Sequence, residues 1–245
     1  MMENYVLVTG ASSGIGRATV VRLSKTYPLI LCGRDEKRLK ETRMMCEKAD
    51  NHLLWRYDLA NVEGIADSLS SFIQENSVAV SGFVHSAGIA PLAPLRMTSL
   101  EAMREIMDVN FFSAVEILKL LSSKKANGKA LEKVVLISSI SSQRGAKGMS
   151  LYSATKGALD AFARSMAYEL APRVRVNTVL PGGVATPGAQ KMAKGVGILQ
   201  DGFPYLLGEG RTQDIADMIA FLLSEQARWI TGQNFVVDGG KTSHC

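Results

Sequence analysis

Three side chains of this sequence have types and spacing that could serve the chemistry of a carbonyl group. Tyr152 and Lys156 are four residues apart, so a helix would place both on one face, and Ser139 ends an apolar run thirteen residues before Tyr152. A phenol titrates near pH 10, about three units too high for a good acid or base at neutral pH, and an adjacent ammonium lowers that pKa. The spacing therefore predicts that Tyr152 exchanges a proton with a substrate oxygen.

Ser139 has a separate role in this hypothesis. Negative charge develops on a carbonyl oxygen when its carbon is reduced, and a hydroxyl held beside it can donate a hydrogen bond to it. A strand-end serine alone would more simply bond to the backbone, and a Tyr-x-x-x-Lys pair alone often arises by chance. The prediction rests on the combination of Ser139, Tyr152 and Lys156.

A glycine-rich segment lies between the first expected strand and the first expected helix. It reads Thr9-Gly10-Ala11-Ser12-Ser13-Gly14-Ile15-Gly16. Glycines let the backbone turn sharply and approach a pyrophosphate, and the helix that follows offers free N–H groups and the positive end of its dipole. The spacing is G-x-x-x-G-x-G rather than the usual G-x-G-x-x-G. We expect this segment to bind the phosphates of a dinucleotide.

The end of the second expected strand indicates which dinucleotide binds. A carboxylate there would bond the ribose hydroxyls and select NAD, whereas this chain has Gly33 and then Arg34. A small residue and a guanidinium leave room for a 2′-phosphate and offer it charged donors. Asp35 follows directly and weakens the argument, Arg34 could be a plain surface cation, and Arg17 could either add positive field or face solvent. On balance the sequence favours NADP(H).

These residues need a scaffold, and the chain alternates β-rich apolar runs with amphipathic helical stretches. Such alternation implies βαβ units, and strands that are apolar throughout imply a parallel sheet buried on both faces. We expect strands over residues 5–9, 29–32, 53–57, 80–85, 134–138, 175–180 and 234–237, and helices over residues 16–26, 36–48, 62–75, 100–122, 150–170 and 212–224.

No linker divides the chain, so we expect one domain over residues 1–245. Residues 183–210 form a long stretch that is rich in glycine and proline and has no clear periodicity. Loops of that length in compact domains are usually functional, and this one follows a strand late in the chain, where an open α/β sheet places its ligand crevice. We interpret it as a substrate lid; the alternative is a tolerated surface insertion.

Composition argues against several other classes of protein. The net charge is +5, but the 28 lysines and arginines are scattered rather than gathered on one element, as they would be in a nucleic-acid-binding protein. The three cysteines lack the spacing of a metal site and favour no disulfide framework. No signal peptide and no run of membrane-spanning length is visible. We expect a cytoplasmic protein that binds no metal, nucleic acid or membrane.

Ordered motifs along nearly the whole chain resemble those of the short-chain dehydrogenase/reductase family. The resemblance implies a single Rossmann-like α/β domain with a doubly wound, mostly parallel, seven-stranded sheet and helices on both faces. It implies an oxidoreductase that moves a hydride between NADP(H) and a carbonyl or secondary alcohol, without a metal. The motifs are residues 9–16, Asp58, Ala87-Gly88, Asn110, Ser139, Tyr152, Lys156, Pro181-Gly182, Ile230-Thr231-Gly232-Gln233 and Val237-Asp238-Gly239-Gly240.

The resemblance also implies a role for individual residues. Lys156 would bind the nicotinamide ribose, Asn110 would hold a water that connects Lys156 to bulk solvent, and Asp58 would bond the adenine. The expected catalytic residues are Asn110, Ser139, Tyr152 and Lys156. The expected cofactor-binding residues are Gly10, Ser12, Ser13, Gly14, Ile15, Gly16, Arg34, Asp58, Leu59, Ala87, Gly88, Tyr152, Lys156, Pro181 and Gly182, with Val184 and Thr186 at the nicotinamide amide.

One departure from the family pattern follows the fourth expected strand. The family often has Asn-Asn-Ala-Gly there, and this chain has His85-Ser86-Ala87-Gly88. The second asparagine usually braces the backbone around the active site, so Ser86 leaves that bracing open. A catalytic role for His85 would duplicate the proton exchange expected of Tyr152, and a strand-end histidine satisfied by its neighbours is the commoner case.

Within the family the chain is most similar to 3-oxoacyl-[acyl-carrier-protein] reductases. Arg173 matches a basic residue that contacts the carrier protein, whereas the usual companion of that residue has no clear counterpart and Lys129 is only nearby. Reductases of sugars, steroids and small ketones share this style of sequence. The substrate pocket would be shaped by the lid together with Ile140, Ser141, Arg144 and Met149.

Two further expectations concern partners and class. The resemblance implies a homotetramer or at least a homodimer, with contacts through the helices that start near Leu100 and Ser150 and through residues 229–240. A non-catalytic NADP(H)-binding sensor or scaffold could be built on the same fold. The intact set of expected catalytic residues argues against that alternative.

Overall fold

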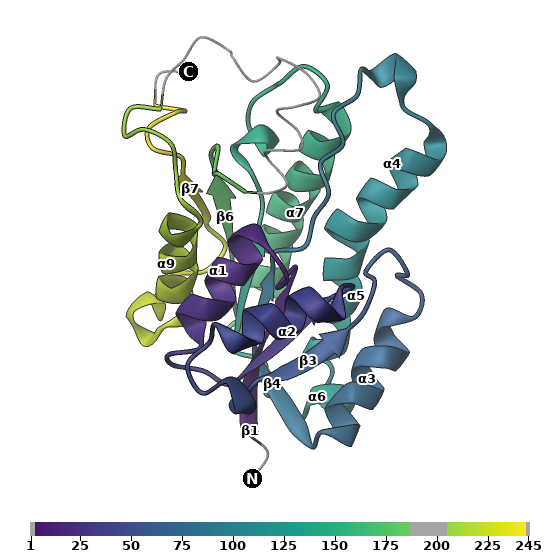
Figure 1. The fold of residues 1–245 in the computed structure, drawn as a ribbon, viewed down its shortest axis with the longest axis vertical. Coiled ribbons are helices and arrows are strands. Elements are labelled where there is room, and N and C mark those ends of the chain that lie inside the picture. The colour runs from purple at the N-terminus through teal and green to yellow at the C-terminus, as the bar shows by residue number, and fades with distance from the viewer. Residues whose placement is uncertain (1–2, 187–204, 244–245) are drawn as a thin grey trace.

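The computed structural model describes residues 3–186 and 205–243, and within them seven strands form one parallel sheet (Figure 1). The strand order is β3-β2-β1-β4-β5-β6-β7, so the winding direction reverses between β1 and β4. Ligands of open α/β sheets bind at such a reversal, outside the carboxyl ends of the strands. The strands are β1 (Glu3–Thr9), β2 (Leu29–Gly33), β3 (Leu53–Arg56), β4 (Val78–His85), β5 (Lys133–Ile137), β6 (Arg175–Pro181) and β7 (Asn234–Val237).

Helices cover both faces of this sheet (Figure 1). One face packs against α3 (Ile65–Glu75), α5 (Ser113–Ser122) and α7 (Ser150–Glu169). The other packs against α1 (Gly14–Leu23), α2 (Glu36–Met44) and α9 (Thr212–Leu223). The remaining helices are α4 (Leu100–Met107), α6 (Lys124–Asn127), the π-helical turn Asp108–Phe112 and the 3₁₀ turns Ala49–Asn51, Leu95–Met97, Ile140–Ser142 and Glu225–Ala227.

The strands are apolar at successive positions because each face of the sheet has its own core. Tyr5 and Leu7 of β1 point into the core under α3, α5 and α7, whereas Val6 and Val8 point into the core under α1, α2 and α9. Side chains alternate across a strand, so only a run without polar interruptions can fill both cores. The expected α/β fold with a doubly wound parallel sheet is confirmed.

The clearest difference from the expected elements is the helix predicted over residues 100–122. The chain forms α4, then one π-helical turn at Asp108–Phe112, then α5, and the Ser113 N–H donates to the Asp108 carbonyl five residues back. Such π-turns occur mostly at functional sites. Most other differences are at the ends of elements: α1 and α2 end at Leu23 and Met44, and α3 starts only at Ile65. The short helix α6 is an additional element that the sequence did not predict.

Most of the expected lid, residues 187–204 of the stretch 183–210, lies outside the described residues. The two described ends of that stretch meet each other. Val184 pairs with Gly210 in an isolated parallel bridge, and the Gly183 N–H donates to the Tyr205 hydroxyl oxygen at 2.8 Å. The described ends of the segment therefore lie together, beside the end of β6.

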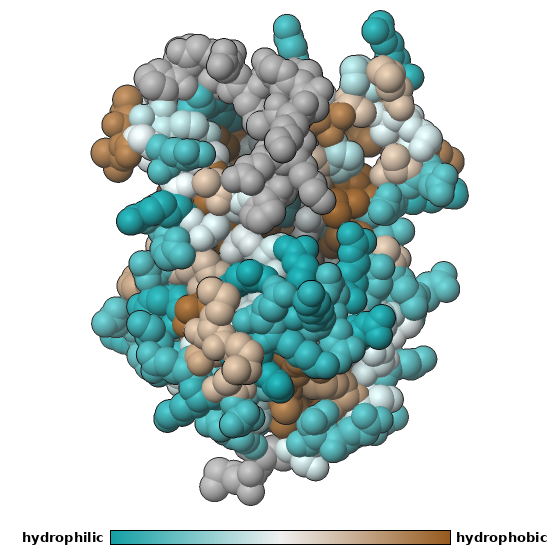
Figure 2. Space-filling model, viewed as in Figure 1, coloured by the Kyte–Doolittle hydropathy of each residue, from teal (hydrophilic) through white to brown (hydrophobic). Residues whose placement is uncertain are grey.

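The surface in this view is mostly hydrophilic below the grey atoms, including the area over α2 (Figure 2). Exposed apolar side chains occur elsewhere; Tyr168, Leu207 and Trp229 are each about nine-tenths exposed, at 92%, 88% and 91%. Among the described residues, none of the helices has the length and apolar character needed to cross a membrane.

Candidate active site

The glycine-rich loop after β1 is closed by backbone contacts that leave no room for a side chain. Gly10 has φ of +67°, and a Cβ on it would lie 2.8 Å from the Ala87 nitrogen at the exit of β4. A Cβ on Gly16 would collide with the Gly10 carbonyl oxygen. The loop is therefore folded tightly against the end of β4, and its backbone can approach a ligand directly.

The N-terminus of α1 opens from this loop. Ser13 is the N-cap residue, but its side chain makes no capping hydrogen bond, so the first N–H groups of α1 keep their capacity for an anion. Across the loop, the Thr186 Cγ2 would lie 3.3 Å from a Cβ on Gly14. This close approach brings the segment after β6 over the loop expected to bind phosphates.

Arg17 acts as a brace in this structure rather than facing solvent alone. Its Nη2 donates to the Ser12 carbonyl at 2.8 Å, and its Nε donates to Thr42 Oγ1 at 3.0 Å. Its Nη2 also lies 3.6 Å from the Glu41 carboxylate. Arg17 therefore ties the glycine-rich loop to α2, and its charge is partly offset by Glu41.

The end of β2 keeps the arrangement that favours a 2′-phosphate. Arg34 is exposed, and it makes no ion pair or hydrogen bond within residues 3–186 and 205–243. Asp35, which weakened the sequence argument, is the N-cap of α2, and its Oδ1 accepts a hydrogen bond from the Arg38 N–H at 3.1 Å. A carboxylate engaged in capping is less available to ribose hydroxyls. Gly33, the last residue of β2, lies near Ser12. A Cβ built on this glycine would be 3.6 Å from the Ser12 Oγ.

The other expected cofactor-binding residues line the same edge of the sheet. Asp58 is exposed after β3, and its Oδ1 accepts from the Ala60 N–H at 3.1 Å, while Leu59 is buried. Pro181 ends β6, and the Gly182 N–H donates to the Val237 carbonyl of β7 at 3.0 Å. The carboxyl ends of the strands from β3 to β7 thus bring these residues to one side.

Ser139 and Tyr152 come together as the sequence predicts. Ser139 follows β5 and is nearly buried, Tyr152 lies in the first turn of α7, and their side chains share a hydrogen bond. Burial raises the pKa of the Tyr152 phenol above 10.0, and the bond with Ser139 lowers it by less. The direction is opposite to the lowering we expected from Lys156.

Lys156 explains this difference by its own contacts. Its ammonium donates to the Ile137 carbonyl at 2.7 Å and lies 5.6 Å from the centre of the Tyr152 ring. Burial lowers the pKa of Lys156 to about 8, although the neighbouring Asp160 carboxylate works to raise it. Lys156 is thus held against the end of β5, over the Tyr152 ring.

Asn110 joins three parts of the site through its side chain. Its Oδ1 accepts from the Ile89 N–H at 2.8 Å, and its Nδ2 donates to the Ile89 carbonyl at 2.9 Å and to Thr155 Oγ1 at 3.0 Å. The Thr155 hydroxyl donates to the Tyr152 carbonyl at 2.8 Å. A Cβ on Gly88 would lie 3.4 Å from Asn110 Oδ1 and 3.5 Å from Lys156 Nζ, so these polar groups flank one glycine.

The bracing that Ser86 left open is supplied by Thr9. The N–H groups of Ser86 and Ala87 both donate to Thr9 Oγ1, at 3.1 and 3.2 Å. His85, beside them, is fully buried with its Nδ1 3.0 Å from the same oxygen. Thr155 was not expected at the site, and Thr9 was expected only as the first residue of the glycine-rich segment. Nothing in the sequence alone indicates their bonds, which join residues from different elements.

Arg173 lies far from these residues. It is exposed after the end of α7, and its Nη1 donates to the Lys129 carbonyl at 3.4 Å, so these two basic residues are neighbours in space. Tyr152, however, is in the first turn of the same helix, which has 20 residues. A helix of that length spans about 30 Å. Arg173 and Tyr152 therefore stand at opposite ends of the molecule's sheet.

Comparison with known proteins places this geometry in context. Residues 10–242 match the family model described as enoyl-(acyl carrier protein) reductase. The L-xylulose reductase of Mesocricetus auratus is 32% identical over 96% of this chain and 94% of its own. The 3-oxoacyl-[acyl-carrier-protein] reductase of Synechocystis sp. is 30% identical over 98% and 97%. The structure of 4-hydroxyisoleucine dehydrogenase complexed with NADH has a TM-score of 0.89 and 26% identity over 99% and 100%.

Proposed function

Because the chain belongs to the short-chain dehydrogenase/reductase family, we propose that it is an NADP(H)-dependent enzyme that reduces a carbonyl group to a secondary alcohol, or catalyses the reverse. The observation that carries the proposal is the pairing of the Ser139 and Tyr152 side chains at the carboxyl edge of the sheet, with Lys156 one helical turn away. These residues can hold and protonate an oxygen beside a nicotinamide.

The glycine loop and the uncapped start of α1 fit a pyrophosphate, and Arg34 fits a 2′-phosphate. Residues at the ends of β4 and β6, among them Gly88, Gly182 and Thr186, would hold the nicotinamide half. When bound, the nicotinamide supplies the hydride for reduction. The relative crystallised with NADH shows that related chains also use the unphosphorylated cofactor, so our preference for NADP(H) rests on Arg34 and Asp35.

The protein side chains manage the proton and the charge of the substrate oxygen. The raised pKa of Tyr152 keeps the phenol protonated at neutral pH, which is the form that a proton donor needs. Ser139 donates a hydrogen bond to the same oxygen. Lys156 is an ammonium below about pH 8, and it stabilises the phenolate that Tyr152 becomes. The rate of reduction is therefore expected to fall as the pH rises through about 8.

The names of the relatives leave more than one class of carbonyl substrate open. Related chains reduce a sugar, as the L-xylulose reductase name states, or a 3-oxoacyl group on a carrier protein. Arg173 stands about a helix length from Tyr152, so a carrier protein bound there would not deliver its acyl group to Tyr152 of the same chain. Docking of a carrier protein at Arg173 would serve this site only across a subunit boundary.

The proposal therefore includes an oligomer, because a carrier protein bound at Arg173 could serve only the active site of another subunit. We expect a homotetramer or homodimer, formed through α4, α7 and residues 229–240, where Tyr168 and Trp229 are exposed. Closed symmetry with matching interfaces is the common solution for such chains. Light scattering at micromolar concentration tests it, and a monomer would count against carrier-protein delivery through Arg173.

A substrate panel tests the function itself. NADPH oxidation is followed with a ketopentose, a small cyclic ketone and a 3-oxoacyl thioester, the last offered both free and attached to acyl-carrier protein. Turnover of any carbonyl supports the proposal, and a preference for the carrier-bound thioester that Arg173→Ala abolishes assigns the carrier protein as partner. Tight NADPH binding without turnover of any member would instead favour a sensor or scaffold.

A further inference from the structure

His85 is a buried titratable group that the proposed mechanism does not use. It is the last residue of β4, and its side chain has no exposed surface. Thr9, directly before the glycine loop, lies on one side of its ring, and Asn110 and Lys156 act on the ring from the other elements of the site. His85 thus stands between the cofactor loop and the catalytic helix.

The contacts of Thr9 determine which nitrogen of His85 carries the proton. A hydroxyl oxygen has two lone pairs and one proton. The two lone pairs of Thr9 Oγ1 accept from the N–H groups of Ser86 and Ala87, so its proton is directed to the remaining neighbour, His85 Nδ1, at 3.0 Å. Nδ1 is therefore an acceptor, and in the neutral ring Nε2 carries the hydrogen.

The ring is also neutral under working conditions. Burial lowers the pKa of His85 to about 3, and the Lys156 ammonium on α7 adds to this lowering. The Asn110 backbone in the π-turn works in the opposite direction. Asp160, one turn further along α7, acts on Lys156. His85 is therefore not a second positive charge beside Lys156.

The Nε2–H group of His85 has one natural target. Nε2 is buried, and no acceptor among the described residues meets it with hydrogen-bond geometry. A backbone group that favours the protonated ring must be a carbonyl, and that group belongs to Asn110. Hydrogen bonds at catalytic sites are often long or poorly aligned without ligands and tighten in the complex. An unsatisfied buried donor is costly, so such tightening is favourable.

We propose that His85 is a positioning residue, which is held as the neutral Nε2–H tautomer by Thr9 and donates to the main-chain carbonyl of Asn110 in the working enzyme. This hydrogen bond fixes the π-turn, and the Asn110 side chain then fixes Thr155 of α7. Thr155 in turn bonds the Tyr152 carbonyl. The inference rests on the proposed function, because it assigns His85 to the placement of Tyr152 and Lys156 for proton transfer.

Two substitutions test the roles of Nδ1 and Nε2 of His85 separately. The amide of asparagine takes the place of Nδ1, so His85→Asn keeps a partner for Thr9 and loses the donor at Nε2. The longer amide of glutamine reaches the place of Nε2, so His85→Gln keeps a donor there. We expect His85→Asn to lower kcat about five- to tenfold, the value of one hydrogen bond, with the Kd of NADPH unchanged. His85→Gln should recover most of the rate.

The pH profile adds a readout of the surroundings of Lys156. Asparagine is smaller than histidine and admits water next to Lys156, so the burial that lowers the pKa of Lys156 is relieved. The alkaline limb of the kcat profile should move to higher pH in His85→Asn and stay in place in His85→Gln. The titration of Lys156, followed by NMR of ¹³C-labelled lysine, should shift in the same direction whether or not a substrate is known.

His52 provides the matched control. It is also buried, its Nδ1 accepts from the Leu29 N–H at 3.1 Å, and its Nε2 lies 2.9 Å from the Glu47 carbonyl, so it has the same tautomer with both nitrogens satisfied. It directly precedes β3 and lies beside the start of β2, away from the site. His52→Asn should lower the melting temperature and leave kcat and both pH readouts as in the unmodified chain.

Imidazole ¹⁵N NMR of the unmodified protein reads the tautomer directly. The expected result is an Nε2–H ring at His85 that stays neutral from about pH 8 to 5, together with the rate loss in His85→Asn and its recovery in His85→Gln. An Nδ1–H tautomer, a His85 that titrates in this range, or equal effects of both substitutions would overturn the inference. Absence of carbonyl reduction in the unmodified protein would refute the proposed function, whereas the tautomer and the Lys156 titration would still be measured.

Discussion

Tyr152 illustrates how a side chain can suit one direction of a reaction. Its phenol has a raised pKa because it is buried, and the lysine one turn later donates a hydrogen bond to the Ile137 carbonyl of β5. At neutral pH the pair is therefore phenol and ammonium, which is the state that reduction of a carbonyl requires. The reverse reaction needs the phenolate, and a higher pH favours it.

The first prediction is that Tyr152→Phe lowers kcat by about 10²- to 10⁴-fold, the usual contribution of a general acid. Phenylalanine keeps the ring and removes only the hydroxyl that bonds to Ser139, so the melting temperature and NADPH affinity should be nearly unchanged. Steady-state kinetics and a fluorescence titration with NADPH measure the two effects. A variant that retained more than about a tenth of the turnover would mean that another group donates the proton.

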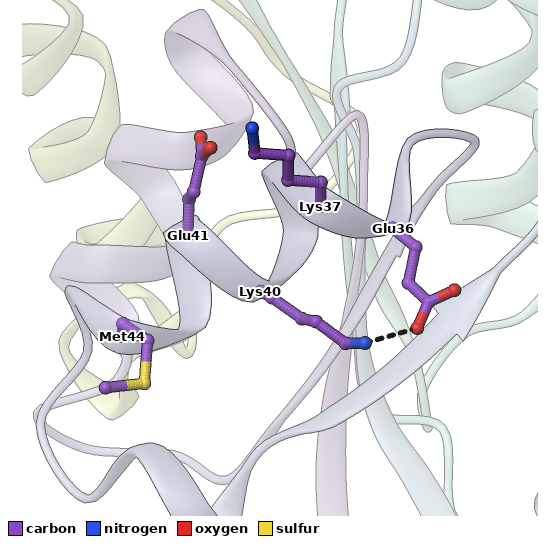
Figure 3. Close-up of a pocket in the computed structure, with 5 residues that line it drawn as sticks. All are labelled: Glu36, Lys37, Lys40, Glu41 and Met44. Atoms are coloured by element: carbon purple, nitrogen blue, oxygen red, sulfur yellow. Dashed lines mark ion pairs between the residues drawn. The ribbon is translucent and has the colours of Figure 1, made fainter.

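The second prediction concerns Arg34, whose guanidinium has no partner of its own within the described part of the chain. Arg34→Ala should weaken NADPH binding by about 1.5–3 kcal/mol, the range for hydrogen bonds to charged groups, and barely affect NADH. Lys40→Ala is the matched control, because this nearby cation on α2 already pairs with Glu36 at 2.6 Å (Figure 3). Calorimetry with both cofactors decides the matter; equal affinity of the unmodified protein for NADPH and NADH would refute the preference.

At the scale of elements, the π-turn between α4 and α5 is the feature that assembles the site. It buries Asn110 where one amide can bond the exit of β4 and the first turns of α7. An uninterrupted α-helix would rotate the residues after the turn by a different amount, so the same sequence would present another side chain there. Three elements that are distant in sequence are thereby held together by one side chain.

The third prediction compares two buried asparagines. Asn110→Ala removes three hydrogen bonds at the site, and Asn127→Ala removes three others, to Val80 and Leu121 at the opposite end of β4. Both leave buried backbone groups unpaired, so each should lower the free energy of unfolding by about 1–3 kcal/mol or more. Below their melting temperatures, Asn110→Ala alone should lose most of its turnover. Equal specific activities, measured with urea unfolding as the companion assay, would show that Asn110 only supports the fold.

For the whole molecule, two buried groups work against stability at particular pH values. The pKa of His85 falls from 6.5 to about 3 and that of Lys156 from 10.5 to about 8 on folding. Between these pairs of values the unfolded chain binds a proton that the folded chain does not, so stability rises with pH in both windows. At neutral pH His85 is largely neutral in both states, whereas Lys156 is charged in both, and the Ile137 carbonyl and the Asp160 carboxylate offset the cost of its burial only in part.

The fourth prediction follows from this linkage. As the pH falls from about 6.5 towards 3, His85 should reduce the free energy of unfolding by up to about 1.4 kcal/mol per pH unit. His85→Gln has no such titration, so the difference between its stability and that of the unmodified protein should shrink or reverse between pH 7 and 5. Urea unfolding at several pH values measures the slope. Identical slopes would mean that folding does not lower the pKa of His85.

The sequence by itself determined the α/β fold and the order of its strands and main helices, and it named the candidate residues of the site. The spacing of apolar residues and the apolar content of a segment indicate whether it is a helix or a strand and how many of its faces are buried. Motifs such as Gly10–Gly16, or the pair Tyr152 and Lys156, are short enough to be recognised in the sequence alone. Element ends were less well predicted, because a helix stops where its last carbonyls find partners, as α2 does at Met44.

Only the tertiary structure decided how these residues act on one another. The direction of the Tyr152 pKa depends on burial, and burial depends on segments that approach from elsewhere in the chain. The bonds of Thr9 to Ser86 and Ala87 span 77 and 78 residues, and those of Asn110 reach Ile89 and Thr155. Likewise, the resemblance implied Arg173 as a contact for the carrier protein, and the length of α7 separates it from Tyr152. Desolvation and the distances between residues are properties of the packed chain, so no local sequence pattern could predict them.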